Sequence, residues 1–358
     1  MSLVALPPQP AGVPWPTGTW PRRDPPGAVA AKLGPLLDLV FDDAGPLATT
    51  YAVVVVQGGA VVAERYGGQL EHFDRPPEPV TDATPLLSWS MAKSILHAAV
   101  GLLVGDGLVD LAAPTDVPEW AAPEDPRHAI TLHHLLAMRD GLDFVEDYVD
   151  ERVSDVIEML FGAGQADTAH FAADRPLAAP PDERFNYSSG TSNIIASIVG
   201  RAVRRGAGDS GPRSVVPFLR ERLFGPLGMH SAQPELDAAG TWVASSYVRA
   251  TARDFARFGL LYLRDGVWDG GRLLPEGWVD YGRTIQSVDP VDGLYGAHWW
   301  GVEGDTLGTF RASGYEGQSI TICPTLDLVV VRLGKTPAAR YPYLTRWRAG
   351  MVAAFGRD

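Results

Sequence analysis

Cysteine is almost absent from this chain of 358 residues, which contains one, Cys323. A single thiol cannot close an internal disulfide, so the fold does not depend on an oxidising compartment. Basic charge is also scarce, because 30 lysines and arginines face 43 aspartates and glutamates and leave a formal net charge of −13. Such a surface repels phosphate backbones and anionic lipid headgroups, so we expect no nucleic-acid partner and no membrane partner.

Long hydrophobic runs are missing as well. The longest nearly unbroken apolar stretch covers residues 95–104, well short of the roughly 18 to 20 residues that a membrane-spanning helix needs. The first basic residue is Arg22 and prolines interrupt the opening segment, whereas a secretory signal needs a basic start followed by an apolar run. These absences predict a cytoplasmic protein without a transmembrane segment.

Several functional motifs cannot be found in the sequence. The eight histidines form no H-E-x-x-H pattern, no glycine-rich loop has the phosphate-binding spacing, and no G-x-S-x-G segment occurs. We therefore expect no metal and no cofactor. The composition, 46% apolar and 20% charged, is that of a globular chain long enough to bury a sizeable core.

Segments rich in β-forming residues lie at both ends of the chain, and a mainly helical stretch separates them. The first two expected strands flank Gly58-Gly59, a two-residue hairpin turn. Thr131 and Thr251 each precede a helical pattern and are expected to cap it. The expected strands are 51–57, 60–66, 309–313, 319–323 and 328–333, and the clearest helical patterns are 27–44, 88–104, 255–263 and 343–355.

This order predicts an α+β fold in which both chain ends build one sheet. We expect a mainly antiparallel sheet of about five strands, flanked by helices and carrying an inserted helical subdomain. Residues 1–26 are rich in proline and are expected to form an extended arm. Residues 27–110 and 241–358 would form the sheet domain, and residues 111–240 the inserted subdomain.

A serine and a lysine open the most apolar of the predicted helices. Lys93, one of only three lysines, follows Ser90 by three residues, so the two side chains share one face of the helix. Desolvation and the positive end of the helix dipole both lower the pKa of a lysine placed there. A neutral amine beside a serine can act as a general base, which makes Ser90 a candidate nucleophile. The alternative is a solvent-facing lysine at a frayed helix start.

Two later segments could complete such a site. Tyr187, in FNYSSG (185–190), could pass a proton to a leaving group if it lies near the serine and the lysine. In ASGYEGQ (312–318), glycines would let a strand edge approach a substrate, and a backbone N–H there could complete an oxyanion hole with that of Ser90. Taken alone, the first segment is also compatible with a loop that caps a helix, and the second is better explained as an ordinary hairpin loop.

In chain order, S-x-x-K at 90–93, Y-x-S at 187–189 and A-S-G at 312–314 resemble the three motifs of the serine β-lactamase and penicillin-binding-protein superfamily. The resemblance covers about residues 45–335 and is strongest to the class C-like branch, in particular to 6-aminohexanoate-dimer hydrolase and esterase-type members. It implies a β-lactamase/transpeptidase-like fold. The supporting stretches are ITLHHLL (130–136), ERLFGPLGM (221–229), TARD (251–254), EDYVD (146–150), WW (299–300) and YEGQ (315–318).

The resemblance implies a role for each matching residue. Ser90 would be the acylated nucleophile, Lys93 its base and Tyr187 a proton relay. The backbone N–H groups of Ser90 and Tyr315 would form the oxyanion hole. The substrate-binding residues that it implies are Tyr148, Ser189, Trp299 and Ser313.

Two positions depart from the superfamily pattern. Ala312 stands where lysine or histidine is expected, so the cation that grips a substrate carboxylate is missing, and Ser189 stands where many relatives have asparagine. We therefore expect a serine hydrolase that acts on small-molecule carboxylic esters or linear amides. The alternatives are a D-amino-acid peptidase or weak β-lactamase, and a non-catalytic member of the fold that binds a peptide.

Overall fold

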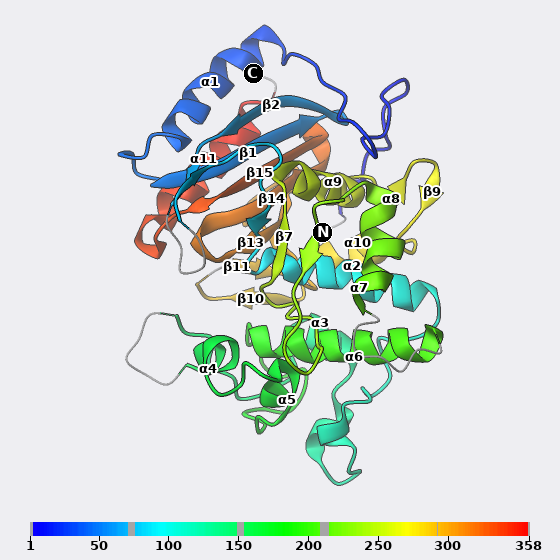
Figure 1. Cartoon of the computed structure of the whole chain (residues 1–358). Helices are drawn as coiled ribbons and strands as arrows, with labels where there is room; N and C mark the ends of the chain where they lie inside the picture. Colours follow the sequence, from blue (N-terminus) through cyan, green and yellow to red (C-terminus); the bar gives the residue numbers. More distant parts are fainter. Residues whose placement is uncertain (1–2, 71–75, 149–153, 208–214, 292, 357–358) are drawn as a thin grey trace.

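The computed structural model describes residues 3–70, 76–148, 154–207, 215–291 and 293–356 of the chain. An eight-stranded sheet forms the upper part of the molecule, and a largely helical part lies below it (Figure 1). The strands follow the order β10-β11-β12-β13-β14-β15-β1-β2, and every pairing is antiparallel. The predicted α+β fold with a mainly antiparallel sheet is therefore confirmed.

The sheet is larger than the sequence predicted. All five expected strands are present, but β10, β11 and β12 extend the sheet beyond β13. These three were missed because a strand of two or three residues shows no readable alternation. The strands of the sheet are β1 (Thr49–Gln57), β2 (Ala60–Tyr66), β10 (Ser287–Asp289), β11 (Gly293–Tyr295), β12 (Trp300–Gly301), β13 (Phe310–Gly314), β14 (Gln318–Cys323) and β15 (Leu328–Lys335).

The predicted helices are present with shifted ends, and both predicted caps are confirmed. The Thr131 hydroxyl accepts from His134 N–H, and the Thr251 hydroxyl accepts from Asp254 N–H. The helices are α1 (Gly27–Val40), α2 (Met91–Gly105), α3 (Leu132–Leu136), α4 (Asp155–Phe161), α5 (Thr168–Ala173), α6 (Ser189–Ala207), α7 (Val215–Leu219), α8 (Gly225–Leu227), α9 (Ala252–Leu263), α10 (Trp278–Arg283) and α11 (Tyr341–Ala353). Short strands outside the main sheet are β3 (Gly68–Gln69), β4 (Glu78–Pro79), β5 (Leu86–Leu87), β6 (Gln233–Pro234), β7 (Val248–Ala250), β8 (Val267–Trp268) and β9 (Gly271–Arg272).

Both faces of the central strands are buried. In β1, Val54 and Val56 pack into the core beneath α2 and α9, whereas Val53 and Val55 pack against α1 and α11. This alternation follows from the two-residue period of a strand, and it explains why β1 reads as a continuous apolar run. The sheet is thus a rigid middle layer, and α2 is fixed on the face that points to the helical part of the molecule (Figure 1).

The helical part is built around α6, which packs against α2, α3 and α5. The start of α6 therefore lies beside the start of α2, although about 100 residues separate them in sequence. Our division of the chain into an arm (1–26), a sheet domain (27–110 with 241–358) and an inserted subdomain (111–240) remains a proposal.

Residues 3–26 contain no helix and run along the body of the protein, held by buried arginines. Arg257 on α9 donates to the carbonyl oxygens of Pro16 at 2.7 Å and Gly18 at 3.1 Å. Arg264 donates to Pro7 O at 3.2 Å, and Arg283 on α10 donates to Val4 O. An extended segment has no hydrogen-bond partners of its own, so these side chains satisfy its carbonyl groups. Arg264 also donates to the side-chain oxygen of Gln9.

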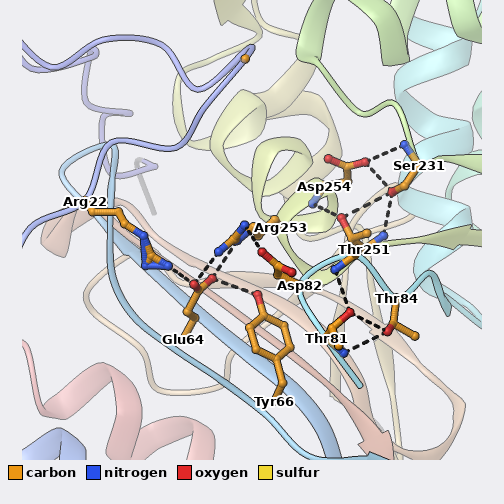
Figure 2. Close-up of polar contacts among 12 residues, drawn as sticks. Arg22, Glu64, Tyr66, Thr81, Asp82, Thr84, Ser231, Thr251, Arg253 and Asp254 are labelled. Atoms are coloured by element: carbon orange, nitrogen blue, oxygen red, sulfur yellow. Dashed lines mark hydrogen bonds and ion pairs between the residues drawn. The ribbon is translucent and has the colours of Figure 1, made fainter. Parts of the chain in front are cut away.

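A polar network joins the start of α9 to the sheet. Arg253 donates to Glu64 on β2 at 2.6 Å and to Asp82 at 2.5 Å, and Arg22 of the arm pairs with the same Glu64 (Figure 2). Such partly exposed pairs contribute at most about 1 kcal/mol each. Their effect here is on position, because they hold α9 and the segment before β5 against one edge of the sheet.

Candidate active site

The candidate nucleophile lies at a sharp turn between β5 and α2. Ser90 is the N-cap residue of α2 and is half-buried. The residue before it, Trp89, has a positive φ of 44°, which residues other than glycine rarely adopt. The turn is held by Ser88, whose hydroxyl lies 3.1 Å from the carbonyl oxygen of Ser246. The strained backbone therefore has a local anchor and presents the serine at the helix start.

Lys93 is buried, with 2% of its surface exposed, and its amine meets three oxygen atoms. Nζ lies 3.1 Å from Ser90 Oγ, 3.0 Å from Ser189 Oγ and 3.0 Å from the carbonyl oxygen of Ser245. The alternative of a solvent-facing lysine is therefore wrong. Because the three oxygens belong to α2, to α6 and to the segment before β7, three separate parts of the chain meet at one amine.

The three oxygens around Lys93 Nζ match the three N–H donors of a protonated amine, and two of them can only accept. The Ser189 hydroxyl donates to the Glu146 carboxylate at 2.6 Å, so its oxygen must accept from Lys93. The Ser245 carbonyl can only accept as well. Once the amine has lost a proton, two N–H bonds can serve Ser189 and Ser245, and its lone pair can accept from the O–H of Ser90. Burial lowers the pKa of Lys93 from 10.5 to about 8, and Glu146 opposes this change.

Glu146 organises the side of the site formed by α6. Its carboxylate accepts from Ser189 N–H at 2.7 Å, from the Ser189 hydroxyl at 2.6 Å and from the Tyr148 hydroxyl at 2.5 Å. Burial and the Glu146 charge both raise the pKa of Tyr148, so this phenol remains a donor. A continuous hydrogen-bonded chain therefore runs from Lys93 through Ser189 and Glu146 to Tyr148.

Tyr187 lies over the same amine. The centre of its ring is 4.9 Å from Lys93 Nζ, and the ring packs against Trp300 at 5.4 Å and Tyr295 at 5.9 Å. The preceding loop is fixed by Asn186, whose side-chain amide donates to Phe144 O at 3.0 Å. The structure thus brings together Ser90, Lys93 and Tyr187, as the sequence predicted.

The end of β13 contacts the turn that carries the nucleophile. A Cβ atom added to Gly314 would lie 2.5 Å from Ser88 O and 3.2 Å from Ser90 N, so only glycine permits this approach. Ala312 is 1% exposed and packs toward α2. Ser313 points to the opposite face, where its hydroxyl accepts from Arg311 Nε at 3.1 Å. The structure therefore does not place the Ser313 side chain with the other candidate residues.

An aromatic surface borders the site, but Trp299 is not part of it. Trp299 is completely buried, 4.4 Å from Tyr262 between ring centres, so its predicted contact with a substrate is wrong. The physical reason is that Trp299 precedes β12 and packs on Phe258 and Tyr262 of α9, whereas Trp300, the first residue of β12, is the one that meets Tyr187. On the other side, Tyr148 stacks on Tyr315 at 5.1 Å, and both rings are more than one-third exposed.

Sequence reasoning missed two groups that bind the catalytic candidates. Glu146 lay inside a stretch noted for its resemblance, but nothing local marked its carboxylate as a partner of Ser189. Ser245 contributes a carbonyl oxygen, which any residue has, so the sequence holds no signal for it. Among the residues that the structure describes, no three or more histidine, cysteine, aspartate or glutamate side chains are grouped as metal ligands. None of the described helices is both long and apolar enough to span a membrane.

Comparisons with known proteins agree with this geometry. The family model described as Beta-lactamase matches residues 46–350. The chain belongs to the beta-lactamase family. The 6-aminohexanoate-dimer hydrolase of Paenarthrobacter ureafaciens is 31% identical over 347 residues, which cover 90% of this chain and 83% of that protein. Membership and this relative together show that the protein is a hydrolase.

Solved structures show the same fold. A Bacillus anthracis protein provisionally assigned as a 6-aminohexanoate-dimer hydrolase superposes with a TM-score of 0.70 at 23% identity and covers 90% of this chain and 83% of its own. A penicillin-binding protein homologue from Caulobacter crescentus gives a TM-score of 0.67 at 19% identity, covering 93% of this chain and 99% of its own. The predicted superfamily and fold are therefore confirmed.

Proposed function

We propose that the protein is a serine hydrolase that cleaves carboxylic esters or linear amides through an acyl-enzyme on Ser90. The observation that carries this proposal is the Lys93 amine, which is buried, contacts no carboxylate of the described residues and lies 3.1 Å from Ser90 Oγ. A binding protein has no need for a desolvated amine within hydrogen-bond distance of a serine hydroxyl. The arrangement therefore favours catalysis over the alternative of a non-catalytic peptide-binding member.

In the proposed reaction, the neutral Lys93 takes the proton of Ser90 as Oγ attacks the carbonyl carbon of the substrate. Tyr187, held beside the amine, passes a proton to the departing alcohol or amine and takes one back from the Lys93 ammonium, which is thereby neutral again. A water molecule then gives a proton to Lys93 as it attacks the acyl-enzyme, and that proton passes to Ser90 Oγ as the acid is released. Each proton lost by a nucleophile reaches a leaving group, so the cycle balances.

The backbone N–H groups of Ser90 and Tyr315 are proposed to hold the developing oxyanion. Support comes from Gly314, whose close approach brings the chain on either side of it against the start of α2. Donors fixed in the backbone need no reorganisation when negative charge develops, and one such donor is worth about 3 to 4 kcal/mol in the transition state.

The substrate class is proposed from what borders the site. Ala312 supplies no cation for a substrate carboxylate, and a charge-assisted contact of that kind is worth about 1.5 to 3 kcal/mol. Tyr148, Tyr315 and Tyr187 offer aromatic surface and hydroxyl groups instead. The 31% identical relative is named for a dimer of 6-aminohexanoate, whose two units are joined by a linear amide, and this supports a linear amide as a target.

A side-by-side hydrolysis panel tests the proposed class of substrate. We expect ready hydrolysis of short-chain p-nitrophenyl esters and of linear ω-amino amides, with at most weak turnover of nitrocefin. The Ser90→Ala variant should be inactive on every compound. A wild-type enzyme that hydrolyses nitrocefin or a D-amino-acid peptide better than p-nitrophenyl butyrate would instead support the peptidase or β-lactamase alternative.

A further inference from the structure

His298 lies between the two helices that carry the candidate catalytic groups. It belongs to the turn from β11 to β12 and is 2% exposed. Its carbonyl oxygen accepts from the Ser94 hydroxyl on α2 at 2.7 Å, and its ring Nε2 is 3.1 Å from the Ser192 hydroxyl on α6. One residue therefore binds both helices, once through its backbone and once through its side chain.

The two serines lie next to Lys93 and to one of its hydrogen-bond partners. Ser94 is the next residue along α2, and Ser192 is one helical turn beyond Ser189, which binds the Lys93 amine. Any change in the separation of α2 and α6 would change the distance from Nζ to Ser189. The contacts of His298 oppose that change, because they connect the first turns of both helices.

Holding histidine in this place is unfavourable in two ways. Its φ is 58°, a left-handed conformation that residues with a side chain rarely adopt. Its Nδ1 atom is buried and has no hydrogen-bond partner among the described residues. A glycine would relieve the backbone and leave no orphaned nitrogen. Such a residue persists only where the surrounding structure imposes it, which makes its position a clue to function.

The charge state of the His298 ring also suits its position near Lys93. Burial lowers the pKa of His298 well below its usual value, and the neighbouring His97 and Lys93 on α2 lower it further. Burial likewise lowers the pKa of His97 to about 3. Both imidazoles are therefore uncharged at neutral pH, and they place no positive charge beside the amine.

We propose that His298 is a positioning residue that ties the first turns of α2 and α6 together and thereby keeps Lys93 Nζ within reach of both Ser90 and Ser189. The functional part of this inference rests on the proposed role of Lys93 as the base. The geometric part does not, because it concerns only the surroundings of the amine.

The scarcity of lysine provides a direct test. Protein labelled with [ε-¹³C]lysine gives signals from only three side chains, Lys32, Lys93 and Lys335. In the wild type, the Lys93 signal should titrate near pH 8. The His298→Gly variant should admit water between the helices and move this midpoint upward by at least half a pH unit.

Three further variants separate positioning from simple stability. His298→Asn tolerates the left-handed backbone and keeps a side-chain hydrogen bond, so it should retain most of the wild-type midpoint and rate. Ser192→Ala removes only the partner on α6 and should shift the midpoint in the same direction as His298→Gly. Ser197→Ala is the matched control, because that hydroxyl bonds to Ile194 O within its own helix, and it should change neither quantity.

The same variants are then assayed with p-nitrophenyl butyrate. We expect kcat to fall at least tenfold in His298→Gly and in Ser192→Ala, with KM changing less than twofold, and thermal unfolding to confirm that each is folded. If His298→Gly or Ser192→Ala is folded and its Lys93 midpoint is unchanged, the proposal is overturned. If His298→Gly does not fold, the midpoint of Ser192→Ala alone tests the proposal. A Ser90→Ala enzyme that stayed active would refute the proposed function, but it would not change the NMR titration of Lys93. Failure of the proposed function can therefore be distinguished from failure of the positioning role of His298.

Discussion

Helices α2 and α9 each bury a basic side chain near their N-termini, and the groups that contact the two side chains differ. On α9, Arg257 pairs with Asp254 at 2.5 Å, and the same carboxylate accepts from the backbone and hydroxyl of Ser231 (Figure 2). On α2, Lys93 meets two hydroxyls and a carbonyl, and the first turn contains no acidic residue.

The difference teaches how a buried base is kept reactive. Both helix starts carry the positive end of a dipole, which disfavours a cation. Arg257 is charged because a guanidinium does not lose its proton in proteins, and at α9 the Asp254 carboxylate offsets the burial of that charge, so the side chain serves as a fixed anchor for the arm. At α2 no carboxylate of the described residues contacts the amine, and a lysine, unlike an arginine, can lose its proton when buried. The kind of basic side chain and the presence of a carboxylate partner together separate a structural cation from a candidate general base.

The largest effect should come from removing each basic side chain and measuring activity. Lys93→Ala should lower kcat/KM for p-nitrophenyl butyrate by about 10²- to 10⁴-fold, the usual contribution of general acid–base catalysis. Arg257→Ala, the matched change on α9, should stay within about threefold of the wild type when folded. Equal losses in the two variants would show that the contrast between the helices is mistaken.

The free energy of unfolding should show the reverse order, with the larger loss when Arg257 is replaced. Arg257→Met leaves Asp254 buried without its partner and should lower the free energy of unfolding by about 3 kcal/mol. Lys93→Met removes an amine that is costly to bury, so the free energy of unfolding should stay within about 1 kcal/mol of the wild type or rise. Urea unfolding at pH 7 measures both, and a Lys93→Met variant less stable than Arg257→Met would contradict the prediction.

The pH dependence of stability sharpens the same contrast. Lys93 has a folded pKa of about 8, below its unfolded value of 10.5, so the unfolded chain holds more protons between these limits. The free energy of unfolding contributed by this group therefore rises with pH from about 8 to 10.5, by an amount on the order of 3 kcal/mol. Subtracting the curve of Lys93→Met from that of the wild type isolates it. A flat difference would mean that the amine stays protonated when folded.

The smallest expected effect concerns Glu146. Its charge raises the pKa of Lys93, so Glu146→Gln should move the acidic limb of the kcat/KM profile to lower pH. The amide can still accept from Ser189, so we expect the maximum rate to fall only about tenfold. A limb that moves to higher pH would show that the carboxylate does not act on the amine through its charge.

How much the sequence predicts depends on how local the determining contacts are. The caps at Thr131 and Thr251 and the pair Ser90 and Lys93 are set within one helical turn, and all were found. Glu146 and Ser245 reach Lys93 only after distant segments fold together, so no spacing marks them. The choice between Trp299 and Trp300 depends on where a two-residue strand begins, which periodicity cannot predict.

The measurement that tests the central claim most directly is the rate at which a fluorophosphonate modifies the enzyme as a function of pH, with the modified residue identified by peptide mapping. The account predicts a single label on Ser90, a rate that rises with an apparent pKa near 8, and loss of this rise in Lys93→Ala. A label on another residue, or a rate on Ser90 with the same pH dependence in wild type and Lys93→Ala, would contradict it.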